Sequence, residues 1–191
     1  MTENMSRKQP FKSDSLQMQV IAATAMIRVH SLHDLQQLSA IQLKLPEKTG
    51  QCCGSDPAAL CLRPNEWLVV SETTDSTELL QQVQFNIDLQ NTSVFDNSDG
   101  LSVIRLSGRG AAWLLSKLSG LDYLAGTAVG SHCARTKIGH VAAVVYYHQV
   151  KGSSFLFDLI FDRSVEEYLW DLLSESAPHA DDLAHAFGDA A

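Results

Sequence analysis

The chain has 191 residues, of which 45% are hydrophobic and 19% charged, and this composition is typical of a folded globular protein. Its 22 acidic side chains outnumber the 14 basic ones and give a formal charge of -8, which argues against nucleic acid and anionic membrane surfaces as partners. The sequence has no recognisable secretory signal, membrane-spanning run or disulfide framework, so we expect a cytoplasmic protein with four reduced cysteines.

The chain is predicted to form one globular domain between two flexible ends. Residues 1–15 and the acidic tail 177–191 are rich in small and polar residues, and ends of this kind are usually poorly ordered. The domain between them, residues 16–176, is expected to consist of two pseudo-repeated halves. The sequence places these halves at about 16–91 and 92–176.

The first half begins with a β-prone run at residues 26–29. Apolar residues at helical spacing then predict a helix: Leu32, Leu35, Leu38 and Ile41. Glycine, proline and aspartate predict an exposed loop over residues 46–57, and strands follow at 59–62 and 67–70. A second helix is expected after Asp75, which starts a capping box ahead of another apolar stripe: Leu79, Leu80, Val83 and Ile87.

The second half repeats this order. A strand at residues 102–106 leads through Ser107-Gly108 into a helix with one apolar stripe: Ala111, Leu114, Leu115 and Leu118. Strands at 141–147 and 155–161 come next, and a final helix opens at Ser164. Two further strands are predicted between these elements: residues 92–95 and 132–138.

The repeat is clearest in two short runs, Ile27-Arg28-Val29 and Ile104-Arg105-Leu106, each of which precedes the first helix of its half. Each half therefore reads as strand, helix, strand, strand, helix. Because strands and helices do not alternate strictly, we predict an α+β fold with largely antiparallel sheets instead of a doubly wound parallel sheet. The two halves are expected to share one core.

The spacing of the cysteines does not indicate a metal site. Cys52, Cys53 and Cys61 lack the spacing of a zinc ribbon, and no matching pair follows them. Reduced and partly buried thiols are the better interpretation.

Cys133 is a candidate nucleophile because cationic neighbours can lower a thiol pKa. His132 is adjacent to it, but adjacent residues on a strand point to opposite faces. His140 or His148 could act as the base instead, across a hairpin. A packing role for Cys133 remains the stronger interpretation, and we predict no catalytic residue and no metal ligand in the chain.

Other short motifs are explained by local structure. Ser107-Gly108-Arg109-Gly110 has the character of a helix start and not of a phosphate-binding loop, and Asp96 and Asp99 fit a tight turn. No nucleophile elbow is present. From these residues alone we expect a domain that binds or scaffolds.

Four collinear motifs carry a family resemblance. They are Leu62-Arg63-Pro64-Asn65-Glu66-Trp67-Leu68, the segment from Phe95-Asp96-Asn97-Ser98-Asp99-Gly100 to Ile104-Arg105-Leu106-Ser107-Gly108, the segment Cys133-Ala134-Arg135-Thr136-Lys137, and Arg163-Ser164 with Leu169 and Leu173. Together they resemble the gamma subunit of heterotetrameric sarcosine oxidase over about residues 59–176. The sequence departs from that family at Gly120-Leu121, where a Cys-Pro is missing, and at residues 51–56, which look like an insertion.

The resemblance implies the fold of the aminomethyltransferase folate-binding domain and a non-catalytic role in one-carbon and N-methyl amine metabolism. It implies alpha and beta subunits as partners, with flavins and NAD held by them and not by this chain. Exposed tryptophans at Trp113 or Trp170 would be natural contacts for such partners.

An alternative is a stand-alone folate or one-carbon ligand module, related to folate-dependent iron-sulfur repair proteins. A pocket between the halves would then hold a pteridine-like ring, and tetrahydrofolate would be the ligand. Arg105 and Arg135 would bind its carboxylates, with Cys133 nearby.

Overall fold

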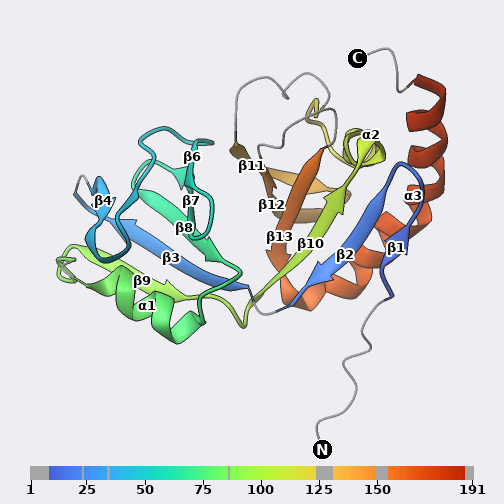
Figure 1. The fold of residues 1–191 in the computed structure, drawn as a ribbon. Helices are drawn as coiled ribbons and strands as arrows, with labels where there is room; N and C mark the ends of the chain where they lie inside the picture. Colours follow the sequence, from blue (N-terminus) through green and yellow to red (C-terminus); the bar gives the residue numbers. More distant parts are fainter. Residues whose placement is uncertain are drawn as a thin grey trace, which may run out of the picture.

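The computed structural model describes residues 9–22, 24–33, 35–85, 87–123, 131–148 and 155–187. Two antiparallel sheets dominate the fold (Figure 1). The six-stranded sheet has the order β1 (Phe11–Lys12), β2 (Gln17–Ile21), β10 (Leu101–Ser107), β13 (Leu156–Asp162), β12 (Val141–Tyr147) and β11 (His132–Ile138). The five-stranded sheet has the order β6 (Cys52–Gly54), β7 (Ala58–Arg63), β8 (Glu66–Ser71), β3 (Ala25–Ser31) and β9 (Thr92–Asp96).

Helices cover the outer faces of the sheets. The remaining elements are α1 (Ser76–Gln84), α2 (Arg109–Leu118), α3 (Glu166–Phe187), the 3-10 turns η1 (Ser39–Ile41) and η3 (Arg163–Val165), and the small strand pair β4 (Gln37–Leu38) and β5 (Leu43–Lys44). Antiparallel sheets combined with segregated helices confirm the predicted α+β class.

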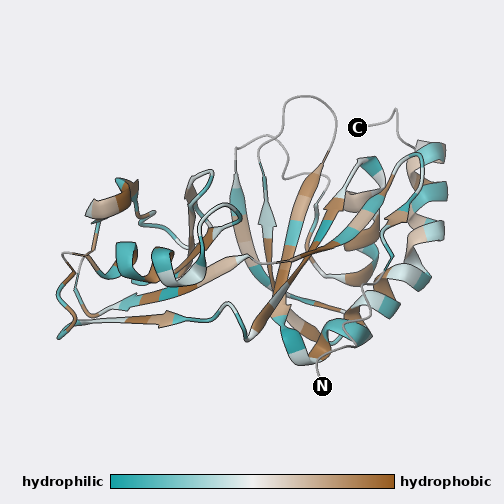
Figure 2. Cartoon of the chain, turned by 60° about the horizontal axis from the view of Figure 1, so that its bottom comes forward, coloured by the Kyte–Doolittle hydropathy of each residue, from teal (hydrophilic) through white to brown (hydrophobic). Residues whose placement is uncertain are grey.

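Three hydrophobic clusters build the core, and the apolar strands are visible in Figure 2. One lies between the six-stranded sheet and helices α2 and α3, and a second lies between the five-stranded sheet and α1. The third joins the inner faces of the two sheets, and we call it the intersheet core: Met26, Ala58, Leu60, Leu62, Leu68, Val70, Val103, Cys133, Tyr146 and Ile160. The predicted sharing of a core between the halves is therefore present in the structure.

The sheets do not follow the predicted halves strand by strand. Strand β2 belongs to the first half in sequence, but it pairs with β10 of the second. Strand β9 belongs to the second half, but it pairs with β3 of the first. Each half therefore contributes one strand to the other's sheet, which ties the halves into one body.

Two segments differ from the sequence-based expectation. The helix predicted from Leu32 to Ile41 is replaced by β4, η1 and β5, and Leu32 points to solvent with 68% of its surface exposed. Part of the predicted loop at 46–57 is strand β6, which pairs with β7.

The acidic tail is also more ordered than predicted, because α3 continues to Phe187 through Pro178. A stripe of small residues packs its last turns against the core: Ala177, Ala180 and Ala184. The side chains of Ser13 and Ser15 donate hydrogen bonds to the Asp181 carboxylate, so the N-terminal segment also holds this end of the helix. Residues 1–8 and 188–191 lie outside the described part of the chain.

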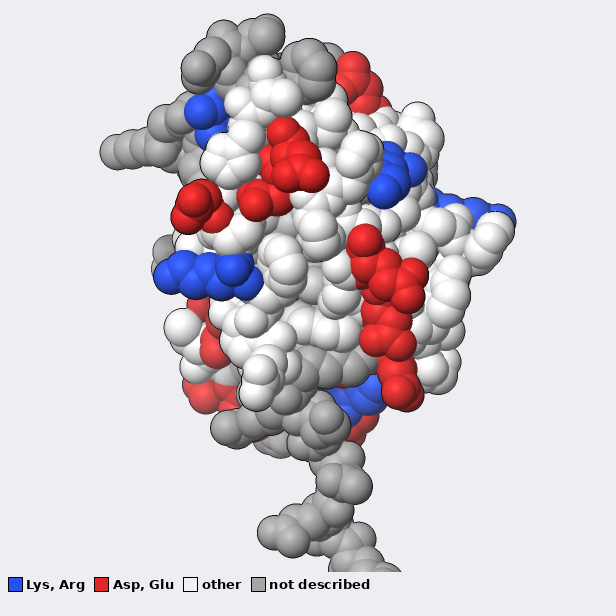
Figure 3. All heavy atoms as spheres, turned by 90° about the vertical axis from the view of Figure 1, so that its right-hand side faces the viewer, with Lys and Arg blue, Asp and Glu red and all other residues white. Residues whose placement is uncertain are grey.

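The surface agrees with the acidic composition. Figure 3 looks onto the side where α3 lies, and acidic and basic side chains are interspersed there without a concentrated basic surface. None of the described helices is long and apolar enough to cross a membrane.

Candidate functional site

Four side chains form a row across the inner face of the six-stranded sheet. Cys133 on β11 is the cross-strand partner of Tyr146 on β12, which is the partner of Asp158 on β13, which is the partner of Arg105 on β10. Directly opposed residues of antiparallel strands present their side chains on the same face. The structure therefore brings two of the predicted site residues, Arg105 and Cys133, into one row.

Arg135, the third predicted ligand residue, lies at the rim of this face. It is the cross-strand partner of Val144, one row further along the sheet than Cys133. Strand β11 is the edge of the sheet, and the Arg135 side chain is exposed to solvent. Strands β12 and β13 thus lie between Arg135 and the Arg105 end of the row.

The centre of the site is a buried ion pair between Arg105 and Asp158. Nε and one terminal nitrogen of Arg105 each donate to a different oxygen of Asp158, and both distances are 2.7 Å. The Nε2 atom of His148 lies 2.6 Å from the same Asp158 carboxylate. The His148 ring also packs on Tyr146, with the ring centroids 4.0 Å apart.

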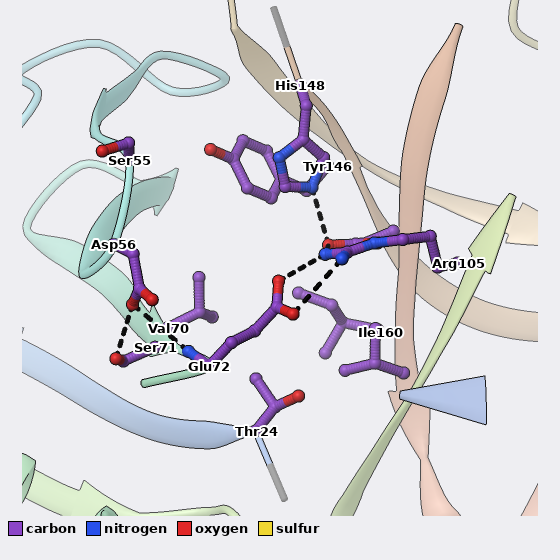
Figure 4. Close-up of a pocket in the computed structure, with 12 residues that line it drawn as sticks. Thr24, Ser55, Asp56, Val70, Ser71, Glu72, Arg105, Tyr146, His148 and Ile160 are labelled. Atoms are coloured by element: carbon purple, nitrogen blue, oxygen red, sulfur yellow. Dashed lines mark hydrogen bonds and ion pairs between the residues drawn. The ribbon is translucent and has the colours of Figure 1, made fainter. Parts of the chain in front are cut away.

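Glu72 reaches this ion pair from the other sheet, directly after β8 (Figure 4). Its two carboxylate oxygens accept hydrogen bonds from Arg105 at 2.5 and 3.2 Å. Asp56 fixes the backbone at this position, because its carboxylate accepts from the Glu72 amide at 3.2 Å and from the Ser71 hydroxyl at 2.5 Å. Arg105 therefore connects two carboxylates that belong to opposite sheets.

The electrostatics of the cluster keep Asp158 and Arg105 charged. Burial alone raises the pKa of Asp158, but the hydrogen bonds from Arg105 and His148 outweigh it and hold the pKa below its usual value. The hydrogen bond to Asp158 raises the pKa of Arg105, against the opposing effect of burial. Burial also raises the pKa of Tyr146, so the phenol stays neutral beside the charges.

The space beside this cluster is small. The cavity between the sheets has a volume of about 30 Å³ and is lined by Arg105, Tyr146, His148, Asp158 and residues facing them. A volume of this size holds about one water molecule. The guanidinium that would bind a folate carboxylate already faces two carboxylates. This space therefore does not fit tetrahydrofolate.

A second cavity of about 150 Å³ lies on the opposite face of the same sheet. Aromatic side chains surround it, including Tyr123, His132, Tyr147 and Phe157. The His132 ring lies 5.0 Å from the Tyr147 ring, centroid to centroid, and Tyr123 meets Phe157 edge to face. His132 thus faces away from Cys133, as the alternation of a strand requires, and the structure does not bring these two residues together as a nucleophile and its base.

Cys133 instead contacts other thiol-bearing residues. Its sulfur donates to the carbonyl oxygen of Cys61 at 3.7 Å, and the interaction with Cys52 lowers the pKa of Cys133. All four cysteines are free thiols. No group of three or more His, Cys, Asp or Glu side chains within the described ranges is placed to hold a metal ion.

Asp158 and Glu72 were not predicted from the sequence, and His148 was considered there only as a possible base for Cys133. One signal for Asp158 is present in the chain, since it stands between Phe157 and Leu159 in a run of otherwise apolar residues. A carboxylate inside a buried strand requires a paired cation, and Arg105 is the buried partner that the strand pairing supplies. Glu72 gives no such signal, because its place opposite Arg105 depends on the packing of the two sheets.

The arrangement is a closed network of paired charges and is suited to joining the two sheets. Each donor of Arg105 at this site faces a carboxylate oxygen, and Asp158 is shared between two partners. Pairing and hydrogen bonding offset the cost of burying these charges.

Comparisons with known proteins find similarity in structure alone. No family model and no curated protein matches the sequence. Among solved structures, the chain is similar to a chain of the heterotetrameric sarcosine oxidase from Corynebacterium sp. U-96, solved in complex with pyrrole 2-carboxylate. The TM-score is 0.71, the sequence identity is 20%, and the match covers 85% of each chain. At this identity the similarity establishes that the two chains share a fold over most of their length.

Proposed function

We propose that this chain is a non-catalytic, gamma-type subunit of a heterotetrameric complex of the sarcosine oxidase kind. Three points support the proposal: the collinear motifs in the sequence, the fold shared with a chain of such a complex, and an exposed apolar surface. The partners would be alpha and beta subunits that hold flavins and NAD and carry out the oxidation. The role would be structural, in the metabolism of N-methyl amines and one-carbon units.

The observation that carries the proposal is the apolar surface beside strand β9. Four of the six large hydrophobic side chains that are exposed in the described residues belong to β9 or to the segments next to it, and we call them the β9 surface: Leu32, Phe85, Leu89 and Phe95. Three belong to the segment between α1 and the end of β9, and the amide of Leu32 donates to the carbonyl of Asn91 at 2.8 Å. Clusters of large exposed apolar side chains are typical of protein interaction sites.

The β9 surface also has unused polar groups. Strand β9 is the edge of the five-stranded sheet, so one row of its backbone groups is not paired within the sheet. Phe95 is the cross-strand partner of Arg28, whose Nε is buried without a hydrogen-bond partner in the described part of the chain. A partner subunit that presents apolar side chains and pairs with the open edge of β9 would cover the exposed side chains and the free backbone groups.

The tryptophans considered from the sequence are less suited to this contact. Trp170 is buried under the six-stranded sheet, and Trp113 is partly buried against the same core. The β9 surface therefore replaces them as the expected site of contact.

Co-expression with alpha and beta chains of a sarcosine oxidase complex from the same genome tests the proposal. The wild-type chain should co-purify with them in a stable assembly. Phe95→Asp should weaken binding by about 30-fold, because it places a charge in a site that becomes buried. The matched control is Tyr168→Asp, which changes another exposed aromatic residue, on α3, and should leave binding intact.

A wild-type chain that remains monomeric in the presence of both partners would contradict the proposal. Equal loss of binding in the two variants would show that the contact is not specific to β9. The proposed subunit role would still stand.

The alternative of a ligand-binding module draws on the second cavity. Its volume of about 150 Å³ and its aromatic lining suit one small planar ring. Titration calorimetry with tetrahydrofolate tests this candidate. Heat that disappears in a Tyr147→Ala variant would favour it, and no heat at millimolar ligand would remove it.

A further inference from the structure

Two cysteines stand at the ends of corresponding rows on the facing sheets. Cys133 begins the row on the six-stranded sheet that continues through Tyr146 and Asp158 to Arg105. Cys52 begins the row on the five-stranded sheet, which continues to the far edge through Leu60, Leu68, Arg28 and Phe95. Both cysteines lie on edge strands, β6 and β11. Both also pack in or against the intersheet core.

The backbone brings these two edges together. Gln51 and His132 form an antiparallel bridge, and the amide of Cys133 donates to the carbonyl of Gly50 at 2.8 Å. A substituent at Gly50 would meet the Cys133 carbonyl oxygen at 3.1 Å, so the strands approach closely here. This is a direct backbone contact between the edge of one sheet and the segment leading into the other.

The two cysteine side chains are neighbours at this junction, since Cys52 packs against the intersheet core that contains Cys133. The interaction between them raises the pKa of Cys52 and lowers the pKa of Cys133. Cys52 is half-buried, so a small solute can reach the pair from solvent, whereas Cys133 is buried. Cys53 follows Cys52 on the same strand and therefore points to the other face of the sheet.

We infer that Cys52 and Cys133 form a site of oxidative modification at which a peroxide generates a disulfide between the two sheets. One thiol gives up its proton and attacks the peroxide oxygen, the O–O bond breaks, and a sulfenic acid and one water form. The second thiol attacks the sulfenic sulfur and releases a second water as the S–S bond forms. The two thiols lose two electrons, and the peroxide gains them.

The bond would change the protein at one defined place. It would link residues 52 and 133 covalently and close a loop that includes β7, β8, α1, β9, β10 and α2. Closing a long loop reduces the freedom of the unfolded chain. The oxidised protein should therefore unfold at a melting temperature about 5–10 °C higher than the reduced protein.

The test uses the whole chain and does not depend on the subunit role. The reduced protein is treated with a small excess of hydrogen peroxide, free thiols are alkylated, and the product is digested and analysed by mass spectrometry. We expect a loss of two hydrogens per chain, a cross-linked peptide pair that contains Cys52 and Cys133, and reversal by dithiothreitol. The melting temperature is measured before and after each step.

Cys53→Ser is the matched control, since it changes a neighbouring thiol that faces the other way; it should still form the bond. Cys52→Ser and Cys133→Ser should each abolish both the cross-link and the rise in melting temperature. A bond between Cys52 and Cys53, a disulfide-linked dimer, or oxidation to separate sulfinic acids would each overturn the inference.

Discussion

The two halves of the molecule carry an arginine at the same place in the repeat, and the two arginines have different surroundings. Arg28 lies in Ile27-Arg28-Val29 on β3, and Arg105 lies in Ile104-Arg105-Leu106 on β10. Both belong to cross-strand rows on the inner faces of the sheets. Arg105 is 18% exposed and makes close hydrogen bonds to two carboxylates. Arg28 is 38% exposed, and its ion pair with Glu66 spans 3.8 Å.

The two halves therefore differ in what their arginine rows contribute: one row joins the sheets, and the other ends at an exposed edge. The row that contains Arg105 is closed, because Asp158 and Glu72 occupy its donors and join the sheets. The row that contains Arg28 ends in Phe95, which is 59% exposed on an edge strand. A pseudo-repeated fold of this kind can use one half to hold itself together and leave the other available for a partner.

The largest loss of stability should come from replacing Arg105, whose donors all face carboxylates. Arg105→Met leaves Asp158 buried with His148 as its remaining partner, so the free energy of unfolding should fall by about 3–5 kcal/mol. Arg28→Met is the matched change in the other half and should cost about 1 kcal/mol or less, because its ion pair is long and partly exposed. Chemical denaturation of both variants measures the two values.

Equal losses of stability in the two variants would break the comparison. They would mean that Arg28 supports the fold as strongly as Arg105, despite its looser contacts. A stable Arg105→Met variant would show that the ion pair is replaceable by apolar packing, as is known for some buried pairs.

The second effect concerns pH. The folded-state pKa of Asp158 lies below its unfolded value, so its carboxylate stabilises the fold above a pH of about 4 and loses this contribution as the pH falls further. At pH 7, Asp158→Asn should lower the free energy of unfolding by about 1.5–3 kcal/mol, the range for hydrogen bonds to charged groups. The difference between wild type and variant should shrink as the pH falls below about 4 toward the lowered pKa of Asp158.

Urea denaturation at a series of pH values measures this difference directly. The subtraction matters because other carboxylates with lowered pKa values, such as Asp181 and Asp96, also weaken the wild type in acid. A difference that stays constant from pH 7 to pH 3 would assign the stabilisation to the shape of the Asp158 side chain and not to its charge.

Much of the fold could be predicted because local patterns decide it. The alternation in Phe155, Phe157 and Leu159 indicated a strand, and β13 forms there with both of its faces buried. Asp75 marks the start of α1 by accepting from the Thr77 amide. The helix predicted after β3 was wrong because three apolar residues of this segment reach the core from short irregular elements. Leu35, Leu38 and Ile41 are at helical spacing, yet they pack against the core from β4 and η1 and the chain before them.

The helical end of α3 was not predicted, because the acidic composition of the tail was given more weight than the spacing of its alanines. Pro178 and the acidic residues indicated disorder, whereas Ala177, Ala180 and Ala184 already have the spacing of a helix face. Arg105 and Cys133 were named from the sequence as ligand residues, and both lie in the candidate site, but the residues around them could not be predicted. These surroundings depend on β2 and β9 crossing between the sheets, and contacts between distant segments leave no local pattern in the sequence.

The smallest expected effect tests the link between the sheets. Glu72 is 45% exposed, so Glu72→Gln should cost about 0.2–1 kcal/mol, and the loss should shrink at about 1 M salt. Combined with Arg105→Met in a double-mutant cycle, the change isolates the coupling between a residue after β8 and one on β10. A coupling near zero would leave the apolar intersheet core as the force that joins the sheets. A measurable coupling would instead show that Arg105 helps to join the two sheets, a role that Arg28 does not have in the other half.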